Sequence, residues 1–299
     1  MKEKIKILEV GLRDGLQNEI KFVSTELKLN LLQLLKASGI KNIELTSFVR
    51  KDKIPQLSDA EEFSKQVNFE TEYNYSALVP NLKGLEKAIE LGYKEISIFG
   101  ACSETFLKKN INLSISESIL QFEQVAKLAI NNNIRVRGYL STIIACPYEG
   151  KIEATKVSEL VKTFLDLGVY EISLGETIGV AVPNEVEVLL SQLVKVVKPN
   201  LLAGHFHDTY GMALANVSKS LEFGIRTFDS SFGGIGGCPY AKGASGNLAT
   251  EDLVYLLENS NFDTGINLDK LIEASILIEQ ILEKPLLSKT YLARKKILF

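Results

Sequence analysis

Short runs of apolar and β-branched residues alternate with longer amphipathic segments along the whole chain. A short apolar run bounded by turn residues favours a strand, and an apolar repeat of about 3.6 residues favours a helix. The pattern predicts eight strands, at residues 5–11, 42–46, 74–79, 95–100, 135–141, 170–174, 201–207 and 227–231. It also predicts eight helices, at residues 25–38, 59–68, 82–91, 115–131, 153–167, 183–198, 212–223 and 250–259.

Glycines mark the borders of these units. Gly39, Gly92, Gly168 and Gly224 each follow a predicted helix and precede a strand, where a left-handed helix cap belongs. Eight strand–helix units favour a closed parallel TIM (β/α)8 barrel. An open doubly wound sheet is the alternative, because periodicity does not show closure. We expect one α/β domain over residues 1–299, with the barrel at about 5–260 and a helical extension at about 261–299 that includes a helix at 268–282.

Charge and composition exclude several classes of protein. The net charge of −3 provides no basic footprint for nucleic acid. No apolar run is long enough to span a membrane, and the N-terminus has no signal or transit pattern, so we expect a cytoplasmic protein. Three cysteines, Cys102, Cys146 and Cys238, are too few and too scattered for a disulfide framework.

The only two histidines of the chain, His205 and His207, stand one residue apart at the end of a predicted strand. Alternate side chains of a strand share a face, so both imidazoles can point at one object. Imidazole is a common metal ligand, which favours a metal. The alternative is a buried pair bonded to nearby backbone.

Further polar residues lie on or next to the predicted strands. Arg13, Asp14, Glu44 and Glu176 belong to other strands, and Asp208 follows His207 on the same one. Each has a local alternative. Arg13 and Asp14 can form an ion pair, Glu44 can bind an arginine inside the barrel, Glu176 can be a helix N-terminal charge, and Asp208 can cap the next helix. In a barrel, however, the C-terminal strand ends converge on one face, which is where barrel enzymes bind their substrates.

A metal set can be assembled from this face. Asp14, His205, His207 and Asn247 offer two nitrogen and two oxygen ligands and no thiolate. Such a set suits a six-coordinate Mg²⁺ or Mn²⁺ completed by water and substrate oxygens. Zinc is the less favoured alternative, because histidine-rich sites also suit it.

The segment 233–246 contains six glycines in fourteen residues. Glycine raises the entropic cost of ordering a segment, so this composition needs a reason. We favour a mobile lid that closes over the substrate and delivers Cys238. A tight backbone approach to phosphate is the alternative, although the sequence has no P-loop.

Three motifs resemble the 3-hydroxy-3-methylglutaryl-CoA lyases, and the similarity extends over nearly the whole chain. They are Arg-Asp-Gly-Leu-Gln-Asn-Glu at 13–19, His-Phe-His-Asp-Thr-Tyr-Gly at 205–211 and Gly-Gly-Cys-Pro-Tyr-Ala-Lys-Gly-Ala-Ser-Gly-Asn at 236–247. The resemblance implies a metal-dependent barrel, a homodimer, that splits the acyl-CoA into acetoacetate and acetyl-CoA. It implies that Asp14, His205, His207 and Asn247 bind the cation. It implies a catalytic group of Arg13, Glu44, Glu176, His205 and Cys238.

The remaining expectations concern the substrate and the base. Residues expected to contact the acyl-CoA are Arg13, Gln17, Ser141, Thr142, Lys108 and Lys109. For the two lysines a solvated surface position is the alternative, and for Ser141 and Thr142 simple packing at the barrel rim. The general base is either His205 or Glu176.

The chain departs from the family pattern at Glu176, where the family usually has Asp. The added methylene displaces the carboxylate by up to one bond length, ~1.5 Å. The segment at residues 50–53 also departs. A lyase for a different 3-hydroxy-3-acylglutaryl-CoA and a catalytically impaired barrel are therefore the alternatives.

Overall fold

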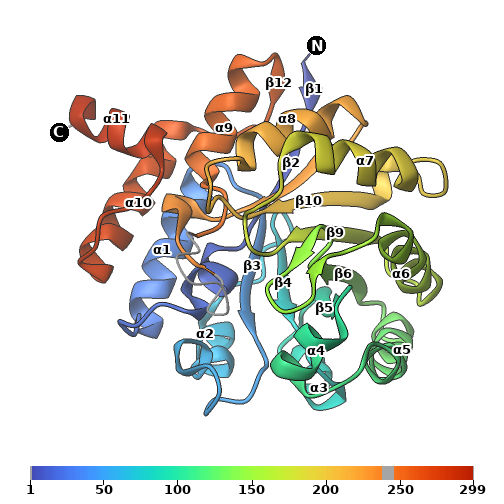
Figure 1. Ribbon diagram of the computed structural model, residues 1–299. Coiled ribbons are helices and arrows are strands. Elements are labelled where there is room, and N and C mark those ends of the chain that lie inside the picture. The colour runs from blue at the N-terminus through green and yellow to red at the C-terminus, as the bar shows by residue number, and fades with distance from the viewer. Residues whose placement is uncertain (1, 238–245, 299) are drawn as a thin grey trace.

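Eight parallel strands close into a barrel in the computed structural model, which describes residues 2–237 and 246–298 (Figure 1). The strands, in their order around the barrel, are β2 (Lys6–Glu9), β3 (Asn42–Ser47), β4 (Asn74–Leu78), β5 (Glu95–Ala101), β6 (Arg135–Ser141), β9 (Glu171–Glu176), β10 (Leu202–Phe206) and β11 (Thr227–Ser230). Strand β11 pairs with β2 and so closes the ring. The predicted TIM barrel is confirmed, and the alternative of an open sheet is wrong.

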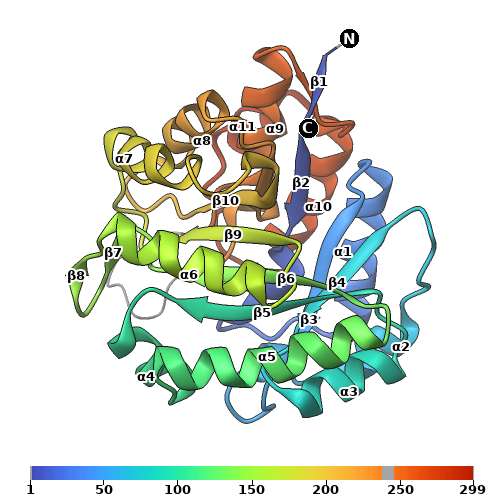
Figure 2. The same cartoon turned by 90° about the vertical axis from the view of Figure 1, so that its right-hand side faces the viewer.

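Helices surround the barrel, as the view turned by 90° shows (Figure 2). They are α1 (Thr25–Ala37), α2 (Ala60–Gln66), α3 (Leu82–Glu90), α4 (Glu104–Ile111), α5 (Ile115–Asn131), α6 (Ala154–Asp166), α7 (Pro183–Leu193), α8 (Ala213–Glu222), α9 (Thr250–Asn259), α10 (Leu268–Leu282) and α11 (Lys289–Leu298). The sequence pattern did not predict α4 or α11. It also missed two small sheets, one of β1 (Glu3–Lys4) with β12 (Phe262–Asp263) and one of β7 (Ala145–Cys146) with β8 (Gly150–Lys151).

The borders of the helices follow from local chemistry. The side chain of Ser114 accepts a hydrogen bond from Glu117 N, and Glu117 accepts from Ser114 N in return, which starts α5. The four glycines predicted as left-handed caps all have positive φ, between 84° and 98°. A Cβ at Gly100 would lie 2.4 Å from the ring of Phe164. Helix α6 therefore packs closely on β5.

One continuous cluster of buried apolar residues runs from Ile5 in the first strand region to Tyr291 in α11. This continuity supports the prediction of a single domain. Within the described part of the chain, no helix is long and apolar enough to cross a membrane.

Candidate metal centre and active site

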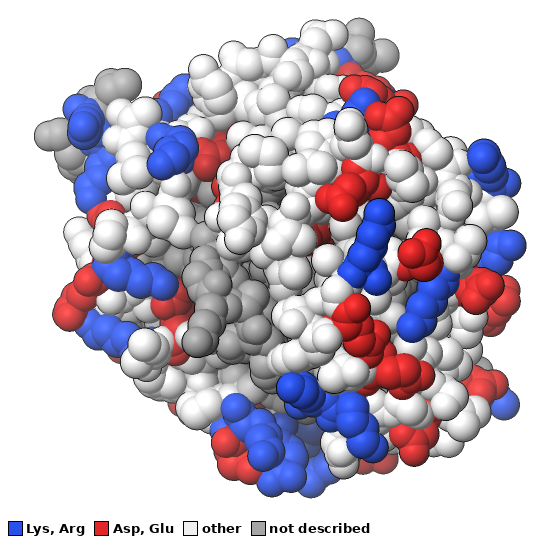
Figure 3. All heavy atoms as spheres, in the orientation of Figure 1, with Lys and Arg blue, Asp and Glu red and all other residues white. Residues whose placement is uncertain are grey.

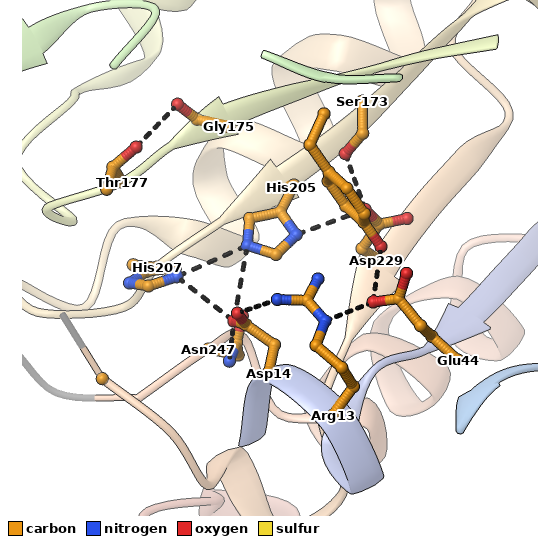
Figure 4. A network of polar contacts seen from close by, with 12 residues as sticks. Arg13, Asp14, Glu44, Ser173, Gly175, Thr177, His205, His207, Asp229 and Asn247 are labelled. Atoms are coloured by element: carbon orange, nitrogen blue, oxygen red, sulfur yellow. Dashed lines mark hydrogen bonds and ion pairs between the residues drawn. The ribbon is translucent and has the colours of Figure 1, made fainter. Parts of the chain in front are cut away.

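Strand β10 and the residue that follows its end bring both histidines to one point inside the barrel mouth (Figure 4). The Nε2 atoms of His205 and His207 are 3.4 Å apart. Asp14 Oδ2 lies 3.9 Å from the first and 4.0 Å from the second. Among the described residues, these three form a group of potential metal ligands whose donor atoms all lie within 4.8 Å of one another.

Asp14 is supplied by a π-helical turn, η1 (Gly11–Gly15), that directly follows β2. The turn is fixed at its start by Glu9, whose Oε1 accepts hydrogen bonds from Gly11 N at 2.8 Å and Phe232 N at 3.0 Å. A Cβ at Gly11 would lie 2.4 Å from the ring of Phe232. The turn thus packs tightly against the segment that begins the glycine-rich loop.

Arg13, on the same turn, joins Asp14 to a second carboxylate. Its Nη1 donates to Asp14 Oδ1 and its Nε donates to Glu44 Oε2. Tyr139 donates to the same Glu44 oxygen at 3.1 Å. The two local alternatives, an Arg13–Asp14 ion pair and a Glu44–arginine pair, are therefore both present. They are parts of the same cluster as the histidines.

The electrostatics of this cluster suit a cation. Burial alone would raise the pKa of Asp14, but the Arg13 guanidinium lowers it to about 2. Burial lowers the pKa of His207 to about 4, so its imidazole is neutral and offers a lone pair. Arg13, Asp14 and Glu44 together carry a formal charge of −1 in a largely buried space. Two imidazoles and a carboxylate beside this negative charge form a donor set that fits a divalent metal.

Asn247, the fourth predicted ligand, also reaches the cluster. It forms an isolated bridge with His207, and its Nδ2 donates to Asp14 Oδ2 at 3.0 Å. The amide nitrogen, not the oxygen, faces Asp14 in this arrangement. Rotation of the amide by half a turn would present Oδ1 instead, so Asn247 fits as a ligand without a change in the backbone.

The profile of the HMGL-like family matches residues 4–278 of this chain. The chain belongs to the HMGL-like family. It is 51% identical over 295 residues to human mitochondrial hydroxymethylglutaryl-CoA lyase, covering 99% of this chain and 91% of the human one. It is 48% identical over 287 residues to the human cytoplasmic 3-hydroxy-3-methylglutaryl-CoA lyase, covering 96% of this chain and 78% of that one.

Solved structures agree with this membership in the HMGL-like family. The HMG-CoA lyase of Bacillus subtilis has a TM-score of 0.96 at 46% identity and covers 98% of both chains. An HMG-CoA lyase from Acinetobacter baumannii, solved with coenzyme A and 3-methylmalate, has a TM-score of 0.92 at 36% identity, covering 97% of this chain and 94% of that one.

Glu176, where we expected a departure from the family pattern, is buried at the end of β9. Its Oε1 accepts from Val180 N at 3.2 Å. Burial raises its pKa to about 7, although backbone donors at residues 179–181 oppose the shift. In the register it is the neighbour of Phe206, the residue between the two histidines. Among the described residues, its side chain forms no hydrogen bond or ion pair with either imidazole.

The residues predicted to bind substrate occupy the rim. Ser141 is half-buried at the end of β6, and Gln17 is half-buried just after η1. Thr142 is buried with φ +58°, an uncommon conformation for a β-branched residue, and its N–H donates to Thr177 Oγ1 at 2.8 Å. Thr177 in turn lies 3.3 Å from Gly175 O (Figure 4).

Three further predictions concern two lysines, a cysteine and a helix cap. Lys108 and Lys109 are exposed on α4, and Lys109 Nζ lies 3.9 Å from the centre of the Tyr148 ring. Cys238 lies outside the described residues. Asp208, expected to cap a helix, accepts from Ala213 N at 2.9 Å and so binds the start of α8.

Sequence reasoning missed the residues beneath the histidines. His205 Nδ1 lies 3.2 Å from Asp229 Oδ2, and Asp229 also accepts from Arg137 and Ser173. The available signal was Arg137 and Tyr139, two polar residues spaced by two within one predicted strand. That spacing places them on one face but does not say that the face is inside the barrel.

Proposed function

We propose that this protein is a divalent-metal-dependent carbon–carbon lyase that cleaves 3-hydroxy-3-methylglutaryl-CoA into acetoacetate and acetyl-CoA. The observation that carries the proposal is the convergence of Asp14, His205 and His207 beside the Arg13 guanidinium. This convergence occurs at the C-terminal end of a barrel whose chain is about half identical to lyases of that name.

Asp14, His205, His207 and Asn247 would bind the cation, and the mixed nitrogen and oxygen set favours Mg²⁺ or Mn²⁺ over Zn²⁺. A divalent cation supplies Lewis acidity, which lowers the pKa of the substrate hydroxyl and orients it.

The cleaved bond joins the tertiary alcohol carbon to the α-carbon of the thioester. Arg13 is buried and fixed by two carboxylates, so its guanidinium is preorganised to stabilise negative charge on the thioester oxygen as the enolate forms. Cys238 would protonate the enolate carbon, because a thiol with a pKa of about 8.5 keeps its proton at neutral pH. Glu44 holds Arg13 in place.

The geometry favours Glu176 over His205 as the general base. His205 Nδ1 faces Asp229, and its Nε2 faces the metal position, so neither nitrogen is free to take the hydroxyl proton. A carboxyl with a pKa of about 7 is suited to general base catalysis near neutral pH.

The proposed substrate is an anionic acyl-CoA, and the surface of the protein carries a group of basic side chains that can bind its phosphates. Lys and Arg side chains gather at the lower edge of one face of the molecule (Figure 3), where Figure 1 places helices α2 to α4. Exposed basic residues of this region include Arg50, Lys51, Lys53, Lys108 and Lys109. We propose that some of them neutralise the phosphates of CoA, while Gln17, Ser141 and Thr142 contact the acyl part.

The test is a coupled assay for acetyl-CoA release with metal-stripped protein and Mg²⁺ or Mn²⁺ added back. We expect turnover of 3-hydroxy-3-methylglutaryl-CoA that depends on the metal. A parallel series with longer 3-hydroxy-3-acylglutaryl-CoA esters tests the acyl preference. Silence toward the whole series, from folded protein that binds the metal, would contradict the proposal and make Glu176→Asp the first variant to examine.

We also propose a homodimer and a cytoplasmic location. The location is not decided by the relatives, which include both cytoplasmic and mitochondrial lyases. Sedimentation equilibrium and cell fractionation test the two statements.

A further inference from the structure

A chain of alternating charges passes through the barrel interior beneath the metal centre. His205 Nδ1 lies 3.2 Å from Asp229 Oδ2. Arg137 donates to both oxygens of Asp229, at 2.8 and 3.1 Å, and its Nε donates to Glu171 at 2.7 Å. Glu171 then accepts from Lys6 Nζ at 2.8 Å. The series starts at a metal ligand and ends at Lys6, whose side chain is 33% exposed.

Strand register explains why Asp229 meets His205. The two residues are direct partners across the parallel pair of β10 and β11. Ser173, from β9 on the other side of β10, donates to Asp229 Oδ2 at 2.6 Å. Three strands thus aim polar groups at one carboxylate, and Asp229 is 2% exposed. The contact is therefore part of the barrel itself.

The partners of Asp229 determine where the proton of His205 lies. Arg137 can only donate, and it occupies both carboxylate oxygens, so Asp229 is ionised and acts as an acceptor. A ring nitrogen that faces a carboxylate oxygen must be the one that bears hydrogen. A neutral imidazole carries one hydrogen, so the other nitrogen, Nε2, keeps its lone pair. This Nε2 is the atom that faces His207 and Asp14.

We infer that Asp229, oriented by Arg137, is a positioning residue that fixes His205 as the Nδ1–H tautomer and aims its bare Nε2 at the metal position. The inference rests on the proposed metal role of His205 and not on which bond the enzyme cleaves. Carboxylates behind metal-binding histidines fix the tautomer and raise ligand basicity in other metalloproteins. Arg137 keeps Asp229 ionised by donating to both of its oxygens, so Asp229 can only accept from His205.

The chain offers an unusually clean test, because it has only two histidines. Protein labelled with ¹⁵N in the histidine rings produces two imidazole patterns in a long-range ¹H–¹⁵N spectrum, and the variant His207→Gln assigns them. In metal-free wild-type protein we expect His205 to carry its proton on Nδ1. A proton on Nε2 would overturn the inference, whatever any variant does.

The decisive variant is Asp229→Asn. The single carbonyl oxygen of the asparagine accepts from Arg137, so its NH₂ group faces His205 Nδ1. Because this NH₂ group donates, Nδ1 must accept and the ring proton moves to Nε2. We expect this tautomer change and a loss of Mn²⁺ affinity of about 10- to 100-fold, the range for such partners of metal ligands. Electron paramagnetic resonance of free Mn²⁺ measures the affinity without any assay of activity.

Two control variants separate positioning from general damage. Glu171→Gln alters the same charge chain but contacts Arg137 and not Asp229. Ser173→Ala removes one donor from Asp229 and leaves its carboxylate. We expect both to keep the wild-type tautomer and Mn²⁺ affinity. An Asp229→Asn protein that keeps them too would contradict the inference. A wild-type protein with the expected tautomer and metal affinity that fails to cleave the acyl-CoA would instead contradict the proposed function alone.

Discussion

The Arg13 guanidinium makes three contacts that a lysine side chain could not make together. Its guanidinium binds Glu44 through Nε and Asp14 through Nη1, and it lies 5.0 Å from the centre of the Tyr139 ring. The planar fork of arginine matches two carboxylates at once, whereas the lysine ammonium is a flexible point charge. The geometry of the side chain, and not only its charge, therefore determines where the thioester oxygen can be stabilised.

We expect Arg13→Lys to bind Mn²⁺ nearly as well as the wild type but to lose about 10²- to 10³-fold in kcat, the usual cost of removing a donor to a developing oxyanion. Steady-state kinetics and a Mn²⁺ titration check this together. Parallel losses of affinity and kcat would instead mean that Arg13 mainly organises Asp14.

The raised pKa of Glu176 predicts how kcat depends on pH. Burial raises its pKa to about 7, so its carboxylate form increases as the pH rises through neutrality. If Glu176 is the base, kcat should rise with pH up to about 7 and then level off. We expect Glu176→Gln to lose this limb and about 10²- to 10⁴-fold in kcat.

The control for this prediction is Glu187→Gln, at an exposed position of α7. It should leave the pH profile unchanged. A limb near pH 7 that persists in Glu176→Gln would show that another group titrates there.

The turn η1 requires a residue without a side chain at Gly11. A Cβ at Gly11 would meet Phe232 at 2.4 Å and Glu9 Oε1 at 2.7 Å. These contacts fix the turn that bears Arg13 and Asp14. We expect Gly11→Ala to shift the turn and to weaken Mn²⁺ binding at least tenfold in protein that remains folded. Overpacking of this kind also costs about 1–3 kcal/mol of stability.

Gly100→Ala is the matched control, because its Cβ would also meet a ring, that of Phe164, at 2.4 Å. That clash lies between β5 and α6, away from the ligands. We expect a similar loss of stability, measured by denaturant unfolding, with normal Mn²⁺ affinity. Equal effects of both variants on affinity would show that general destabilisation, and not the turn, is responsible.

Glu251 joins three elements. On α9, its carboxyl accepts from Gly233 N at 2.9 Å, at the start of the glycine-rich loop, and from Ser275 on α10. Burial raises its pKa from 4.5 to about 7, so folding favours the protonated form. The stabilisation is complete below about pH 4.5, and the free energy of unfolding then falls, by up to about 1.4 kcal/mol per pH unit, until the pH passes 7.

We expect Glu251→Gln to keep both contacts and to reduce this slope. Glu9, whose pKa burial raises to about 8, will keep part of it. Urea unfolding at pH 5, 6, 7 and 8 measures the change, with the exposed Glu273→Gln as control. An unchanged slope in Glu251→Gln would assign the pH dependence to other groups.

The elements show what sequence patterns can and cannot predict. Apolar alternation and glycine caps predicted all eight barrel strands, because these features are local. Helix α4 was missed, since eight residues with only a few buried positions hardly repeat a helical pattern. Asp229 was missed for a different reason. Alternation divides a strand into two faces, but only barrel closure and register decide that Asp229 faces His205.

At the scale of the molecule, the barrel brings together a metal set that no single segment contains. Asp14 follows the first barrel strand, the histidines lie at the end of the seventh, and Asn247 lies beyond the eighth. An unfolded chain holds these groups far apart, so a cation that binds them binds only the folded state. Metal binding must then stabilise the whole protein by mass action.

We expect metal-stripped protein to unfold at a higher temperature when Mg²⁺ or Mn²⁺ is added. At a free metal concentration 100 times Kd the gain is about 2.7 kcal/mol. Because Asp14 supplies the buried carboxylate, Asp14→Asn should remove most of the gain, and His207→Gln should reduce it. The exposed Asp52→Asn, far from the histidines in sequence and on the surface, should show the full gain. A metal response that survives Asp14→Asn would place the cation elsewhere. Glu44 offsets the charge of Arg13, so the cluster without Asp14 would have no net formal charge from these groups to attract a divalent ion.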